Sequence, residues 1–177
     1  MQIKYAWRWF ASVLALIVFS SAFAQNPVKL KLTSYKVIVT VGEEAKRVEK
    51  LVPATEVVPG DVLEWRLRAV NTGQQELKNV ALVIPIPPQT YYLKGSAVAL
   101  TLVSNGEKIT VKPQFSFDGG KTYGFPPVFK EFRVKENGKE VVKKVEVTPE
   151  EYTHVRWVLP VVRPEEVVEV FLRTVVR

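Results

Sequence analysis

The feature that most constrains the fold is an alternation of apolar and polar residues that continues through nearly all of the chain after its N-terminal segment. In VLEWRLRAV, residues 62–70, Leu63, Trp65 and Leu67 share one face of an extended chain, and charged residues share the other. Residues 152–159 repeat the pattern. A period of two is typical of antiparallel strands that have one buried and one wet face. No segment has a sustained helical period, so the pattern indicates an all-β protein.

Turn signals divide this alternation into short strands. Asn105-Gly106 and Asn137-Gly138 each stand between two alternating segments, and such pairs favour tight hairpins because both residues tolerate a positive φ. The prolines of PIPP, residues 85–88, end another strand because proline cannot donate to a ladder. The only helix-start signal is VTPEE, residues 147–151, where we expect a single helical turn.

Together these signals predict an immunoglobulin-like antiparallel β-sandwich of about seven to ten strands. Two facing sheets would bury Trp65 and Trp157 between them. No internal repeat or low-complexity linker interrupts residues 25–177, which we therefore interpret as a single domain. A domain of this size can fold without covalent cross-links, which matters because the chain contains no cysteine.

The first 24 residues have the organisation of a secretory signal peptide. Lys4 and Arg8 provide a positive start, residues 10–19 are almost entirely apolar, and Ala22-Phe23-Ala24 supplies a cleavage site. The alternative is an uncleaved membrane anchor, but the apolar segment is shorter than the ~20 residues that a spanning helix needs. We expect residues 1–24 to be removed, no transmembrane segment to remain, and the product to be periplasmic or on the cell surface.

The charge pattern bears on possible partners. The net charge is +7, but the positive residues are interspersed with glutamates. Arg66 and Arg68 could join Lys29, Lys31 or Arg156 in a basic patch for polyanions if their strands are neighbours, although the interleaved Glu64 argues against it. We therefore expect no nucleic-acid partner. Abundant Glu, Lys and Arg with few thermolabile residues also indicate a thermophilic source.

A series of short motifs also occurs in a fixed order along residues 57–96: Pro59-Gly60-Asp61, Asn71-Thr72-Gly73, Asn79-Val80, the prolines of 85–88, Tyr92 and Gly95-Ser96. A tryptophan strand, a proline turn and a last apolar strand follow in residues 155–176. This order resembles the bacterial conserved-repeat surface domain, although Ile84 and Glu165 replace the family's usual Asp and Gly. The resemblance implies an immunoglobulin-like domain of cell-envelope and S-layer-associated proteins, with no catalytic residues to transfer.

The segment SFDGGKTYG, residues 116–124, is similar to the aspartate box of sialidases. The residues that carry the similarity are Ser116, Asp118, Gly120, Thr122 and Tyr123. A chain of this length cannot form the propeller in which such boxes recur, so we interpret the motif as a structural turn. Whether the turn binds an ion stays open, but it lacks the clustered carboxylates that hard cations prefer.

Catalytic chemistry finds little support in the sequence. His154 is the only histidine and falls on the polar face of its strand, there is no nucleophile motif, and no metal or cofactor signature is present. We expect a non-enzymatic structural or adaptor module of the cell envelope that binds a partner protein or an envelope polymer. The alternative is a carbohydrate-binding module that uses exposed Tyr91 and Tyr92. A long open edge, which we expect at the C-terminal strand, residues 168–176, would favour the protein partner.

Overall fold

The computed structural model describes residues 27–41, 47–104, 106–136 and 139–177. All of its sheets are antiparallel, and the two largest face each other, so the predicted all-β sandwich is confirmed. The predicted signal peptide, residues 1–24, lies outside the described residues. In the part of the chain that the structure describes, no helix has the length and apolar character needed to cross a membrane.

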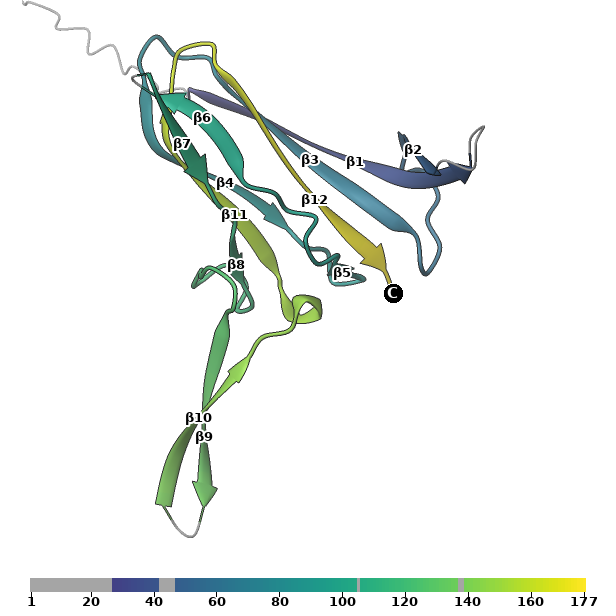
Figure 1. The fold of residues 1–177 in the computed structure, drawn as a ribbon, viewed down its shortest axis with the longest axis vertical. Coiled ribbons are helices and arrows are strands. Elements are labelled where there is room, and N and C mark those ends of the chain that lie inside the picture. The colour runs from purple at the N-terminus through teal and green to yellow at the C-terminus, as the bar shows by residue number, and fades with distance from the viewer. Residues whose placement is uncertain (1–26, 42–46, 105, 137–138) are drawn as a thin grey trace, which may run out of the picture.

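The larger sheet contains five strands in the order β2-β1-β3-β12-β5. Their bounds are Arg47–Pro53 for β2, Val28–Val41 for β1, Val62–Asn71 for β3, Val167–Val176 for β12 and Thr90–Tyr92 for β5. The smaller sheet has the order β4-β11-β8, with β4 at Leu77–Pro85, β11 at His154–Val162 and β8 at Gln114–Ser116. Figure 1 shows the two sheets close together at one end and diverging toward the end where β2 lies.

The core fills the space between these sheets and follows the alternation of the sequence. Leu67 and Leu172 from the larger sheet and Trp157 and Leu159 from the smaller one are almost completely buried. The Trp157 indole N–H donates to the Val98 carbonyl at 3.0 Å, which satisfies the polar atom of a buried ring. Trp65, which we expected to be buried, is only half-buried, and its indole donates to the Thr174 hydroxyl.

Two hairpins extend the sandwich. Strands β6 (Leu100–Ser104) and β7 (Glu107–Val111) form the first, and β9 (Phe129–Glu136) and β10 (Lys139–Glu146) form the second. Both predicted hairpins are therefore present, although residues 105, 137 and 138 of their turns lie outside the described residues. The β9–β10 hairpin, which we call the arm, projects away from the sandwich (Figure 1). The expected helical turn is a short 3-10 helix, Pro149–Glu151.

The expected open edge at the C-terminal strand is wrong. Strand β12 lies inside the larger sheet, where it pairs with β3 from Val167 to Val175 and with β5 near its end. The alternation of residues specifies which side chains are buried, but it does not specify which strands are neighbours. Among the described residues, the larger sheet instead has an open edge at the first half of β1, because β2 pairs only with residues 35–41.

Candidate functional site

A pocket of about 760 Å³ lies where the arm joins the sandwich. Three aromatic rings, Tyr92, Phe115 and Tyr152, form its floor, and Phe125 with Pro126 forms one wall. Pockets of a few hundred to a thousand cubic ångströms that are lined mainly by apolar side chains are typical of ligand sites. The size and lining therefore make this pocket the candidate functional site.

The floor of the pocket is a cluster of rings that come from distant parts of the chain. Tyr92 belongs to β5, Phe115 to β8, and Tyr152 precedes β11. The ring centroids lie 5.1 Å apart for Tyr92 and Phe115 and 4.7 Å apart for Phe115 and Tyr152, with tilted planes. The Tyr92 hydroxyl also accepts a hydrogen bond from the Ala97 N–H at 3.0 Å. Tilted packing and this bond hold the floor rigid.

Charged side chains stand at the mouth of the pocket. Lys94, Lys112 and Glu146 line it and are exposed, and none has an ion-pair partner among the residues that the structure describes. Burial raises the pKa of the Tyr152 hydroxyl, and the nearby Glu146 carboxylate raises it further. The arrangement can enclose an apolar group on the ring floor and orient its polar end with the charges at the mouth.

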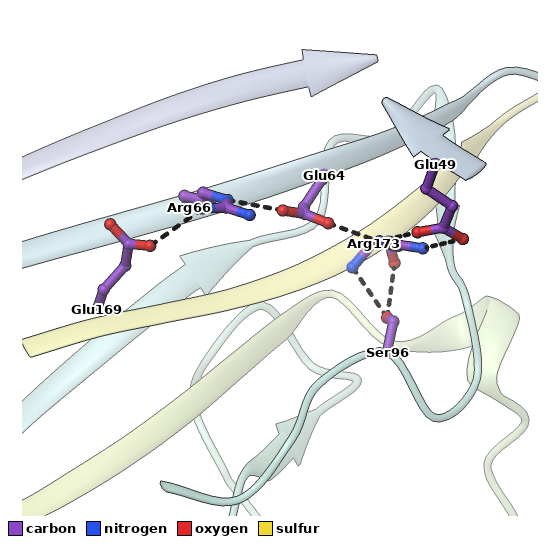
Figure 2. A network of polar contacts seen from close by, with 6 residues as sticks. All are labelled: Glu49, Glu64, Arg66, Ser96, Glu169 and Arg173. Atoms are coloured by element: carbon purple, nitrogen blue, oxygen red, sulfur yellow. Dashed lines mark hydrogen bonds and ion pairs between the residues drawn. The ribbon is translucent and has the colours of Figure 1, made fainter. Parts of the chain in front are cut away.

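The loop that carries Lys94 is fixed to the larger sheet by Ser96. The Ser96 hydroxyl donates to the Arg173 carbonyl at 3.2 Å and accepts from the Arg173 N–H at 2.9 Å (Figure 2). The Leu93 N–H also donates to the Arg173 carbonyl at 2.9 Å. One wall of the pocket is therefore held by the backbone of a strand inside the larger sheet.

The side chain of Arg173 belongs to an ionic network on the outer face of that sheet (Figure 2). At its centre the Glu64 carboxylate is only 1% exposed and accepts from Arg173 Nε at 2.8 Å and from Arg66 Nε at 2.6 Å. Arg173 also binds Glu49 through two nitrogens, and Arg66 reaches Glu169 at 3.4 Å. The hydrogen bond to Glu64 raises the pKa of Arg66. The network joins β2, β3 and β12 and stabilises the sheet to which the pocket wall is fixed.

The aspartate-box segment forms a tight turn after β8, next to the pocket. The Asp118 carboxylate accepts from the Thr122 hydroxyl at 2.6 Å, the Thr122 N–H at 3.0 Å and the Ser116 hydroxyl at 2.7 Å. These bonds, the one from the Thr122 hydroxyl above all, hold the pKa of Asp118 well below its usual range. Gly120 has a φ of +84° and donates its N–H to the Ser116 hydroxyl oxygen at 2.9 Å.

This turn positions one wall of the pocket. Phe115 and Gly124 exchange backbone hydrogen bonds of 2.8 and 2.9 Å across the turn. Phe125 follows Gly124 directly, so these bonds keep it beside the ring floor. The turn is also attached to β11, because the Thr153 N–H donates to the Ser116 carbonyl at 2.7 Å. The described contacts therefore give the aspartate-box turn a positioning role in the pocket.

The tyrosines and the histidine singled out by the sequence have different environments. Tyr92 is buried in the pocket floor, whereas Tyr91 is half-buried with the Arg177 guanidinium 5.8 Å from its ring centroid. The ring of Tyr123 lies 3.9 Å from the Arg156 guanidinium carbon, on the side of the turn. His154 is half-buried, and its Nδ1 lies 3.1 Å from a threonine hydroxyl. Of these residues, only Tyr92 lines the pocket.

Sequence reasoning missed most of the pocket. Phe115 is an ordinary inward position of a short strand, whereas the alternation of residues 152–159 assigns Tyr152 to the outward set, so nothing local indicates that their rings meet. Lys94, Lys112 and Glu146 are three of many scattered charges. The only available signal was the proximity of Phe115 and Phe125 to the two ends of the aspartate box.

No group of three or more His, Asp or Glu side chains that could hold a metal ion occurs within residues 27–41, 47–104, 106–136 and 139–177. Comparisons with protein-family models, curated proteins and solved structures found no significant match to this chain. The resemblance to the conserved-repeat surface domain therefore stays a prediction.

Proposed function

We propose that this chain is an exported, non-enzymatic adaptor module of the cell envelope that holds a partner protein. The observation that carries the proposal is the aromatic-floored pocket beside the exposed arm. A partner's apolar side chain would enter the pocket and contact Tyr92, Phe115 and Tyr152. Buried pockets that receive one large apolar side chain dominate the binding energy of many protein interfaces.

The lining of the pocket favours a protein over a sugar. Sugars expose many hydroxyls that need hydrogen-bonding partners, whereas the walls here are mainly rings, prolines and alanines. The floor rings are tilted against one another and do not form one flat platform. Tyr91 and Tyr92, the residues proposed for sugar stacking, are half-buried and buried.

The arm adds further exposed apolar side chains next to the pocket. Phe132, Val141 and Val145 share one face of the arm with Lys130 and Lys143, and Phe132 is 41% exposed. On the opposite face Glu131 and Lys144 form an ion pair at 3.8 Å. A two-stranded ribbon is marginally stable alone, so a partner that covers these apolar side chains would also stabilise it. Placement in the periplasm or on the cell surface rests on the predicted signal peptide, residues 1–24.

Filling the pocket tests the proposal. Ala99 is exposed and lines the pocket, so Ala99→Trp should block the site without disturbing the core. Ala81 is exposed on the outer face of the smaller sheet, so Ala81→Trp adds the same side chain elsewhere. We expect the original chain and Ala81→Trp to capture the same envelope protein saturably and Ala99→Trp to lose it. Capture of purified envelope polysaccharide alone would contradict the proposal and favour the carbohydrate-binding alternative.

A further inference from the structure

The first half of β1 is an open sheet edge. Strand β3 pairs with β1 from Val28 to Val37 on one side, while β2 covers only residues 35–41 on the other. Among the described residues, 29–34 therefore have a strand neighbour on one side alone. The Thr72 N–H donates to the Pro27 carbonyl on the β3 side at 2.6 Å. Because backbone groups alternate in direction along a strand, those of Leu30 and Leu32 point toward the open side.

The two faces of this edge have different chemistry. Lys29 and Lys31 lie on the outer face of the sheet, where Lys31 stands directly opposite Arg68 of β3. None of these three cations has an ion-pair partner in the part of the chain that the structure describes. On the inner face, Leu30 is 58% and Leu32 is 43% exposed. Within the described part of the chain, the edge at residues 30–32 therefore presents backbone groups without a strand partner, a row of positive charge and two uncovered leucines.

We propose that an extended segment of a partner protein, with acidic and apolar residues in alternation, adds to this edge as a further strand. Main-chain hydrogen bonds to residues 30 and 32 would supply affinity, as in other cases of strand addition. The acidic side chains would lie beside Lys29 and Lys31, and the apolar ones would cover Leu30 and Leu32. Arg68 and Lys31 would then lie between two carboxylates, Glu169 of β12 on one side and the acidic residue of the partner on the other.

The lysines favour such a partner over a second copy of this chain. Pairing two copies of this edge face to face would put Lys29 and Lys31 of one copy against the same residues of the other. Like charges that are directly opposite each other destabilise a strand pair, and lysine is a common means by which edges resist self-association. A segment with carboxylates at these positions would instead be attracted by the two lysines, so the edge would bind an acidic segment in preference to a second copy of itself. The edge shares no residue with the aromatic pocket, so this proposal and the proposed function can fail separately.

The test uses the purified chain and two blocked peptides of eight residues, one alternating glutamate with valine and the other lysine with valine. Binding is measured by titration calorimetry, and backbone NMR signals show which residues respond. We expect the acidic peptide to bind saturably, to protect the amides of Leu30 and Leu32 from exchange, and to bind about tenfold more tightly than the basic one, as two cross-strand charge pairs predict. Absence of binding by the acidic peptide, or equal binding of both peptides, would overturn the proposal.

Two variants locate the site. Reversing both charges with Lys29→Glu and Lys31→Glu should invert the preference toward the basic peptide, and both side chains are exposed, so the fold should remain. Leu32→Pro removes an outward N–H, which edge strands tolerate, and should abolish peptide binding, whereas Leu32→Val should retain it. Peptide binding that survives Leu32→Pro, or a preference that does not change with the charges, would also overturn the proposal.

Discussion

The buried carboxylate of Glu64 gives the sharpest test of what holds the larger sheet together. Glu64→Gln keeps the shape of the side chain but removes its charge. The carboxylate accepts from Arg66 Nε at 2.6 Å and from Arg173 Nε at 2.8 Å, so both of its oxygens face donors. In the variant one of these oxygens becomes an amide NH₂, which is itself a donor and would face a guanidinium.

The size of the effect follows from the burial of the three groups. Removing one partner of a buried ion pair typically destabilises a protein by about 3–5 kcal/mol. Glu64 is fully buried, but both arginines are partly exposed and keep a second carboxylate, Glu169 for Arg66 and Glu49 for Arg173. Since these remaining contacts moderate the loss, we expect the free energy of unfolding to fall by about 3 kcal/mol.

Urea unfolding followed by tryptophan fluorescence measures this loss. The matched control is Glu169→Gln, because Glu169 is 44% exposed and contacts the same Arg66 from the far end of the network. Exposed ion pairs contribute about 0–1 kcal/mol, so the control should unfold at nearly the same urea concentration as the original chain. A loss below about 1 kcal/mol for Glu64→Gln, or equal losses for both variants, would refute the interpretation of Glu64 as the centre of the network.

Three further expectations concern the turn, the core and the arm. Because the pKa of Asp118 is lower in the folded chain, its contribution to stability is present above the unfolded value of about 3.9 and is lost as the pH falls toward the folded value. Lowering the pH below 4 should therefore reduce the midpoint temperature of thermal unfolding more steeply for the original chain than for Asp118→Asn. Parallel plots of midpoint temperature against pH for the two chains would contradict this. Trp157→Ala should lower the free energy of unfolding by about 3–5 kcal/mol in urea, because it empties a completely buried site. Phe132→Asp should change that free energy by less than about 0.5 kcal/mol and yet weaken capture of the envelope partner, and unchanged capture would exclude the arm from the interface.

Sequence reasoning could reach the fold class because strand periodicity and Asn-Gly turns are local signals. They placed the two hairpins and the inward face of β3 correctly. They could not specify which strands are neighbours, because pairing depends on contacts between distant segments. For this reason β12 was expected at an edge, and Leu30 and Leu32, although they continue the inner face, were not recognised as uncovered.

The same distinction applies to the candidate site. The aspartate-box turn is within reach of the sequence because the bonds made by the Asp118 carboxylate and the Ser116 hydroxyl all lie within residues 116–122. The pocket is not, because its floor rings come from three segments that only the folded sandwich brings together. Tyr92 was noticed for its position after prolines, a signal that says nothing about Phe115 or Tyr152.

The attachment of the arm has a consequence for how this protein could diversify. The Val147 N–H donates to the Val128 carbonyl at 2.8 Å, and both side chains are buried, so the sandwich core closes at the point where the arm departs. All of the side chains that the structure describes in β10 are exposed. Residues 129–146 could therefore change in length and sequence, by insertion or by exchange, with little effect on the folding of the sandwich. A chain built in this way can acquire a new partner by altering one hairpin while its core stays the same.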